Sequence, residues 1–286
     1  MTDELTEPAH HTSPLGQWVH ARLRPARLAG LVDEIWYFEG ALAIPRERVF
    51  ADGRYELVVQ LGPRYRLVDA RGSTDFPTCC LGGLRLGPEV IEAPPGHLAV
   101  LGVKLTPPGA LALLRAPLHE TAGITVALDD VVAGASAELH DRCASAAGAR
   151  QRLHAASAWL HGRMAGATLP EPAVAWAAAE IERRNGALSI TALRDRTGWS
   201  RTRFTERFRE QVGVTPKVLA RMHRFRNALA RITDQGNSSL TDIALAAGYY
   251  DQAHFSNEFR LFSGYTPAAF LRALRFPNSV SLAEER

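Results

Sequence analysis

The sequence contains few cysteines, almost no lysine and no long apolar run. Its 286 residues include three cysteines, of which Cys79 and Cys80 are neighbours and Cys143 is distant. This spacing argues against a disulfide framework and against a Cys-x-x-Cys zinc site. A redox or metal role for Cys79 and Cys80 stays open beside a simpler interpretation, two small semi-apolar residues in or beside a strand.

The lack of long apolar stretches argues against a membrane-spanning helix, and no membrane partner is expected. No run approaches the ~20 apolar residues that a membrane-spanning helix needs. Residues 1–14 are polar and lack the apolar core of a signal peptide. We therefore expect a disordered N-terminus over 1–14 and a cytoplasmic protein.

Positive charge is carried almost entirely by arginine, because Lys104 and Lys217 are the only lysines. Residues 170–286 hold 17 basic and 12 acidic side chains, a net charge of +5, whereas residues 1–169 have a net charge of −2. A mildly basic C-terminal part beside a slightly acidic N-terminal part suits a nucleic-acid binder with an attached module.

The N-terminal half is expected to be rich in β-strands. Glycine and proline interrupt short apolar runs at close intervals, which favours a small barrel or sandwich. The expected strands are 35–38, 55–61, 65–68 and 98–105. A short helix is expected to follow at 107–114, and then two longer helices at about 129–144 and 148–164.

The most informative pattern is an imperfect repeat over 189–216 and 239–267. Each copy runs as a helix, a glycine turn, a helix with a Phe-x-x-x-Phe stripe, and a Gly-x-Thr-Pro segment. The turn glycines Gly198 and Gly248 lie 50 residues apart and the stripes lie 51 apart, so the second turn has one extra residue. Such paired helices are typical of helix-turn-helix DNA binding, and a tandem pair is far more specific than one unit.

The second helix of each copy has an apolar face and a polar face. Ser200 and Asp251 stand at the expected N-cap positions. The opposite, polar faces carry side chains that can hydrogen-bond to bases, although a merely solvated face is the alternative for either helix alone. The inward-facing residues are Phe204 and Phe208 in the first copy and Phe255, Phe259 and Phe262 in the second.

These motifs resemble the DNA-binding domain of the AraC/XylS family of transcription regulators over roughly residues 171–275. The resemblance implies seven helices, with two helix-turn-helix units joined by a long helix at about 216–232. The residues that carry it are Gly198-Trp199-Ser200, Phe204, Phe208-Arg209, Gly213-Val214-Thr215-Pro216, Arg224-Phe225 with Ala228, Asp242-Ile243-Ala244, Gly248-Tyr249, Asp251-Gln252-Ala253-His254-Phe255, Phe259-Arg260 and Gly264-Tyr265-Thr266-Pro267.

Position by position, the resemblance implies which side chains face DNA. The base-reading residues would be Arg201, Thr202, Thr205 and Glu206 in the first unit and Gln252, Ala253, Ser256 and Asn257 in the second. The phosphate contacts would be Arg203, Arg209 and Arg260. Arg194 departs from the family pattern, because the first unit usually has alanine there and the second unit keeps Ala244. Either the first unit packs less tightly at Arg194 or this side chain turns toward DNA.

The N-terminal half is similar, less specifically, to the sensor module of one branch of this family, on Asp52-Gly53 to Leu61 and on Gly102 to Gly109. The resemblance implies an α+β chain of two domains: a β-rich cupin-like barrel with trailing helices, and an all-α seven-helix domain with two helix-turn-helix units. The expected segments are 1–14 disordered, 15–127 sensor, 128–165 helical dimerisation or packing segment, 166–172 linker, 173–276 DNA-binding domain and 277–286 tail.

The resemblance implies a sequence-specific regulator of transcription that binds double-stranded DNA. A small-molecule effector, RNA polymerase and a second copy of the chain are further candidate partners, and no cofactor is expected. We expect no enzymatic activity, because three cysteines cannot supply the four thiolates of the family's DNA-repair members and the histidines are too scattered for a metal-dependent cupin site. An effector-independent protein that binds DNA and dimerises remains the alternative.

Overall fold

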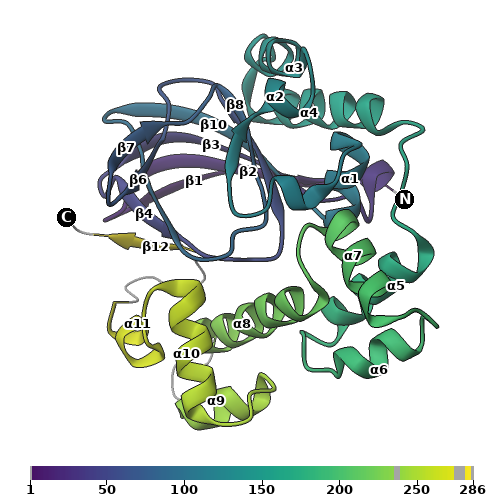
Figure 1. Cartoon of the computed structure of the whole chain (residues 1–286). Coiled ribbons are helices and arrows are strands. Elements are labelled where there is room, and N and C mark those ends of the chain that lie inside the picture. The colour runs from purple at the N-terminus through teal and green to yellow at the C-terminus, as the bar shows by residue number, and fades with distance from the viewer. Residues whose placement is uncertain (1, 235–238, 274–280, 285–286) are drawn as a thin grey trace.

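The computed structural model describes residues 2–234, 239–273 and 281–284. A β-rich N-terminal domain is followed by a helical C-terminal domain, and the two are in contact (Figure 1). This confirms the predicted α+β fold class. Within the described residues, two sheets form the β-rich domain and seven α-helices form the C-terminal domain.

The larger sheet has seven antiparallel strands. One face packs on helices through buried residues such as Ile35, Leu57 and Val103. The other face carries Val100 and Leu98 with Trp36 and Phe38 packed against them, and it forms a second apolar cluster. In spatial order the strands are β1 (Glu4–Ser13), β2 (Gly16–Arg24), β3 (Val32–Leu42), β10 (His97–Leu105), β5 (Tyr55–Gln60), β8 (Cys79–Gly82) and β11 (Thr125–Ala127).

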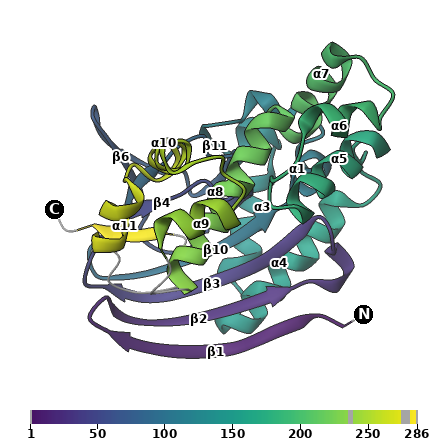
Figure 2. The ribbon, with the colours of Figure 1, turned by 90° about the horizontal axis from the view of Figure 1, so that it is seen from below.

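The N-terminal residues are not disordered, contrary to the expectation for 1–14. They form β1, the outer strand of the larger sheet, beside β2 and β3 (Figure 2). The register of β1 on β2 shifts between Thr6 and Ala9, on either side of Pro8. Proline cannot donate a backbone hydrogen bond, so an irregularity on an edge strand is where a sheet tolerates it.

The smaller sheet combines four strands of the N-terminal half with one strand near the C-terminus. Its edge strand β12 (Ser281–Glu284) pairs with β4 in the β-rich domain, with Ser281 opposite Val49. The expected boundary between residues 276 and 277 lies outside the described residues, but residues 281–284 form a strand in this sheet. The remaining strands, in order, are β4 (Arg46–Val49), β9 (Glu89–Glu92), β6 (Arg66–Asp69) and β7 (Gly72–Asp75).

Helices cover one face of the larger sheet, and most of them follow its strands in the chain. The expected single helix over 129–144 is wrong, because Gly134 adopts a positive φ of 67° and separates two shorter helices. The Thr106 hydroxyl caps the first α-helix by accepting from the Gly109 amide at 3.1 Å. The helical elements are η1 (Ala26–Leu28), α1 (Pro107–Leu114), η2 (Leu118–Glu120), α2 (Leu128–Val131), α3 (Ala135–Ala144) and α4 (Gly148–Met164).

The C-terminal domain places one long helix between two pairs of short ones. Figure 1 shows α8 running from the first pair, α6 and α7, to the second pair, α9 and α10. Proline 216 opens α8, where no backbone N–H is needed. The seven helices are α5 (Pro172–Arg183), α6 (Ile190–Asp195), α7 (Arg201–Val212), α8 (Pro216–Asp234), α9 (Leu240–Ala246), α10 (Gln252–Ser263) and α11 (Pro267–Ala273).

The two domains share a continuous apolar core. Phe50, just after β4, lies edge-to-face against Phe225 of α8 at 6.3 Å and Phe270 of α11 at 5.7 Å between ring centroids. The buried Tyr55 hydroxyl donates to the Val212 carbonyl at the end of α7, at 3.1 Å. The helical domain is therefore held against the β-rich domain at the end of α7 and along α8 and α11. In the described part of the chain, every helix is too short or too polar to cross a membrane.

Candidate DNA-binding surface

The first helix of each unit, α6 or α9, supports the second helix, and a serine serves as its N-cap. The Ser189 hydroxyl accepts from the Ala192 amide at 3.2 Å, and the Ser239 hydroxyl accepts from the Asp242 amide at 3.1 Å. The Ser239 hydroxyl also donates to the Asp242 carboxylate at 2.7 Å. These bonds satisfy backbone donors that the first turn of a helix leaves free, so both supporting helices begin at fixed positions.

The recognition helices α7 and α10 are fixed at both ends. The Ser200 hydroxyl accepts from the Arg203 amide at 3.3 Å, and the Asp251 carboxylate accepts from the His254 amide at 2.7 Å, as predicted from the sequence. Both helices end at a glycine in the left-handed conformation, with φ of 97° in the first unit and 80° in the second. Each unit therefore holds a rigid helix of defined length.

The predicted phenylalanine stripes are buried, which confirms their inward orientation. Phe204 and Phe208 of α7 lie 5.9 Å apart between ring centroids. In the second unit, Phe225 of α8 packs on Phe259 at 5.2 Å and on Phe262 at 5.4 Å. These aromatic contacts fix the rotation of α10 on α8, so the polar face of each recognition helix turns away from the core.

The polar faces present the predicted base-reading residues to solvent. Within the described chain, none of their side chains forms a hydrogen bond or ion pair. The two sets occupy equivalent positions in the repeat and lie on units at opposite ends of α8 (Figure 1). The exposed residues are Arg201, Thr202, Glu206, Gln252, Ala253 and Asn257, and the half-buried ones are Thr205 and Ser256.

The three predicted phosphate contacts are exposed arginines. The Arg203 guanidinium stacks over the Trp199 ring, 4.6 Å from its centroid. Arg209 and Arg260 occupy the last turns of α7 and α10, and neither lies within ion-pair distance of a carboxylate in the described residues. Their charges are thus free for an external anion.

The far ends of both recognition helices are docked on the β-rich domain. A Cβ atom on Gly213 would lie only 2.0 Å from the Tyr55 hydroxyl, and one on Gly264 would lie 2.8 Å from the Arg48 guanidinium. No side chain fits at Gly213. The C-terminal glycine caps are thus covered, whereas the N-terminal halves of α7 and α10, which carry the predicted reading residues, are open to a partner, as are the exposed Arg209 and Arg260.

Sequence reasoning missed the charged residue between the phenylalanines of each stripe. Glu258 is buried in α10, where its carboxylate pairs with Arg221 at 2.5 Å and Arg224 at 3.3 Å on α8. Arg207 holds the same position in α7 and pairs with Glu171 and Glu210. The sequence spacing could have indicated that both side chains face inward. Each lies three residues after a buried phenylalanine (Phe255 or Phe204), and residues i+3 and i+4 share a helix face with residue i.

Two further positions differ between the units. Arg194, the departure from the family pattern, pairs with Asp195 at 2.5 Å and is half-buried, whereas the equivalent Ala244 is buried. The extra residue in the second turn is Tyr250, whose side chain is 89% exposed. The spacing of the repeat could have indicated this exposed aromatic directly before the α10 cap.

The cysteines lie in the interior as free thiols. The Cys79 thiol is 3.5 Å from the Ser136 carbonyl oxygen and can donate to it. Burial raises the pKa of Cys79 and of Cys80 to about 12, which disfavours the thiolate that redox or zinc chemistry needs. Among the described residues, no three histidine, cysteine or acidic side chains are grouped closely enough to hold a metal ion.

Comparison with known families identifies both domains. Residues 193–273 match a family described as a helix-turn-helix domain, and residues 22–127 match a domain of unknown function, DUF6597. No curated protein matches the chain.

Several solved structures are similar at low identity. ToxT from Vibrio cholerae is 10% identical, with a TM-score of 0.47, and the match covers 84% of this chain and 99% of that one. The C-terminal domain of AraT, a response regulator from Geobacillus stearothermophilus, is 20% identical with a TM-score of 0.34, covering 38% and 90%. The xylose-binding transcription activator XylR is 20% identical with a TM-score of 0.31, covering 43% and 38%.

The helix-turn-helix match covers most of the tandem repeat, including both recognition helices and the long helix between them. Its residues include the glycine turns, the buried phenylalanine stripes and both C-terminal glycine caps. Residues 193–273 therefore form a helix-turn-helix domain of the matched family, and a β-rich domain precedes it.

Proposed function

We propose that this regulator reads two adjacent major-groove segments, one with α7 and one with α10. The observation that carries the proposal is the open N-terminal half of each recognition helix, whose polar face has no partner among the described residues. A capped, rigid helix with such a face suits direct contact with base edges. The implied separation of the two contacts is about one turn of DNA, ~34 Å.

The side chains suggest a different base preference for each unit. Asn257 and Gln252 can bond bidentately to adenine, and the Ala253 methyl can contact a thymine methyl. In the first unit Arg201 can bond to guanine, and Glu206 can accept from the cytosine amine. We therefore propose that the second unit favours A·T pairs and the first favours G·C pairs.

Three arginines would hold the backbone of the duplex. Arg203, Arg209 and Arg260 lie on the same two helices as the reading residues, and they are exposed. Contacts to phosphate fix register without reading sequence, and they make binding dependent on salt. The net charge of +5 on residues 170–286 supports this role.

We also propose that a small molecule bound by the N-terminal domain modulates DNA binding. The support is direct contact between the domains. The Tyr55 hydroxyl donates a hydrogen bond to the end of α7, and Phe50 packs on α8 and α11. A ligand that alters the barrel near these residues can thus bias both units. The boundary 173–276 for the DNA-binding domain is part of the proposal, whereas a homodimer and RNA polymerase contact stay predictions.

Binding of the purified chain to its own upstream DNA and to a scrambled duplex, at two salt concentrations, tests the proposal. We expect a preference for the upstream region of ~10³-fold or more. Equal, salt-sensitive binding to both duplexes would contradict sequence-specific reading and would favour an architectural role.

A further inference from the structure

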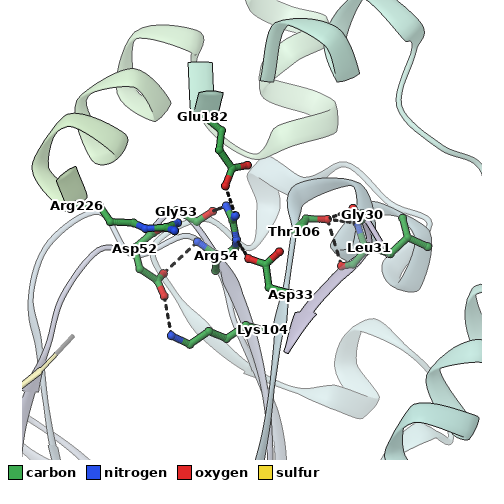
Figure 3. A network of polar contacts seen from close by, with 11 residues as sticks. Gly30, Leu31, Asp33, Asp52, Gly53, Arg54, Lys104, Thr106, Glu182 and Arg226 are labelled. Atoms are coloured by element: carbon green, nitrogen blue, oxygen red, sulfur yellow. Dashed lines mark hydrogen bonds and ion pairs between the residues drawn. The ribbon is translucent and has the colours of Figure 1, made fainter. Parts of the chain in front are cut away.

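A charged cavity lies where the barrel meets the long helix α8. Its volume is about 410 Å³, and it opens between β2, β3, β10, the turn before β5 and α8. Figure 3 shows five of its lining residues at this junction. Every lining side chain is ionisable: Arg24, Asp33, Glu34, Asp52, Arg54, Lys104 and Arg226.

Most of the carboxylates in this cavity already have a cation. Arg54 is buried and donates to both Asp33 of β3 and Glu182 of α5, so it ties the two domains together (Figure 3). The Lys104 ammonium lies 3.4 Å from the Asp52 carboxylate. These pairs leave little negative charge unbalanced on the barrel side of the cavity.

Two arginines of the cavity have much weaker partners. Arg226 of α8 is exposed, and its guanidinium donates to the Asp52 backbone carbonyl at 3.5 Å. In the described chain no carboxylate lies within ion-pair distance of it. Arg24 faces Glu4 at 3.5 Å, with side chains 63% and 72% exposed. Such an exposed pair contributes little, so both arginines can bind an external anion.

We propose that this cavity binds a small hydrophilic anion, a carboxylate or phosphate that also carries hydroxyl groups, between Arg24 of β2 and Arg226 of α8. Arginine binds either anion through paired, charge-assisted hydrogen bonds. Hydroxyls of the ligand would donate to Glu34 and Asp33. Because every lining side chain is ionisable, an aliphatic tail or bare aromatic ring meets only the methylene stems of arginine and lysine there, so a hydrophilic anion is favoured.

This inference rests on the proposed effector control and gives it a place and a chemistry. A ligand held by both walls contacts both domains, so it binds most tightly when the domains are docked as in this structure. Binding then favours that docking. Since α8 joins the two helix-turn-helix units, the relative placement of the recognition helices depends on the ligand.

Calorimetric titration of the full chain tests the proposal with four probes. Citrate and glucose 6-phosphate are the hydroxylated anions, one a carboxylate and the other a phosphate. Glucose has hydroxyls without charge, and decanoate has charge with an apolar tail. We expect one citrate or one glucose 6-phosphate per chain, bound at least ~10-fold more tightly than glucose or decanoate. Which of the two binds identifies the anionic group.

Arg226→Gln should weaken binding of that probe by ~10-fold or more, because a charge-assisted contact is lost. Arg226 is exposed, so the fold should be retained, as thermal unfolding will check. Arg231→Gln is the matched control, because Arg231 lies on the same helix and donates to Asn227 at 3.3 Å outside the cavity. Its affinity should stay within ~2-fold of the parent value.

Absence of binding by both hydroxylated anions, tighter binding of decanoate, or equal affinities in Arg226→Gln and the parent chain would overturn the cavity proposal. Parallel measurement of selective binding to upstream DNA, without a probe and with each hydroxylated anion present, separates this failure from failure of the regulator. A chain that selects its DNA but binds neither anion contradicts only the cavity. A chain that binds an anion but selects no DNA in either condition contradicts the proposed DNA function.

Discussion

The two helix-turn-helix units carry opposite charges at the same internal position, Arg207 in the first and Glu258 in the second. The Glu258 side chain is 6% exposed and pairs with two arginines of α8. The Arg207 side chain is 40% exposed and pairs with Glu171, at the start of α5, and with Glu210. The two copies of the repeat therefore use this position for different contacts. The second unit is bound to the long helix α8, and the first unit is bound to the segment that connects the β-rich domain to α5.

This difference indicates which part of the molecule fixes the orientation of each unit. The Arg207 hydrogen bond lowers the pKa of Glu171, so the contact between the first unit and the interdomain segment stabilises the carboxylate form. Gln211 also reaches this segment, donating to Glu171 at 2.9 Å. The second unit has its main charged contact inside the helical domain. We therefore expect changes in domain docking to act first on α7.

The largest expected effect comes from the core of the second unit. Phe259→Ala should lower the free energy of unfolding by about 3–5 kcal/mol, because a fully buried ring is removed. Denaturant unfolding measures the change, with Phe208→Ala as the equivalent variant in the first unit. Full stability of Phe259→Ala would contradict the inward stripe of α10.

The second prediction compares the stability contributed by the Glu258 and Arg207 ion pairs. Glu258→Gln should destabilise the protein by about 2–3 kcal/mol, since two arginines lose a buried carboxylate. Arg207→Gln should cost about 1 kcal/mol or less, because its ion pairs are partly exposed and screened by water. Unfolding curves of the two variants, recorded together, give the ranking. Equal losses would mean that the two anchors are equivalent.

Base reading should respond to Asn257→Ala. We expect a loss of about 1–3 kcal/mol in binding free energy at the operator, with relaxed preference at one base pair. Glu206→Ala at the equivalent position in α7 should relax a different base pair, in the other half of the site. A uniform loss on every duplex would instead make Asn257 a general contact.

The smallest effect is expected from single phosphate contacts. Arg209→Ala should weaken binding to all sequences alike and reduce the slope of log K against log salt by about 1. Arg260→Ala makes the same test in the second unit. An unchanged slope in either variant would remove that arginine from the phosphate contacts.

Local patterns predicted most of the helical domain. The cap residues Ser200 and Asp251 and the buried stripes follow from spacing along one helix, which a sequence displays directly. The strands over 35–38 and 98–105 were also found, because their apolar runs end at glycine or proline. The eight predicted reading residues were located on exposed faces by position in the repeat, and their roles stay predictions.

Features that depend on distant pairing could not be predicted in this way. The polar strand β1 has no apolar periodicity and exists because β2 pairs with it. Strand β12 depends on a partner more than 200 residues away, β4. The sequence around Arg54 indicates only a turn, whereas its partner Glu182 lies 128 positions further along the chain. Charge pairs of this kind become visible only when the domains are packed together.

A hydroxyl-radical footprint on the upstream DNA tests the central claim, that both units read one site, most directly. The account predicts two protected segments about one turn of DNA apart, ~34 Å, with Asn257→Ala altering only the segment beneath α10. A single protected segment, or protection of every sequence to the same extent, would contradict it.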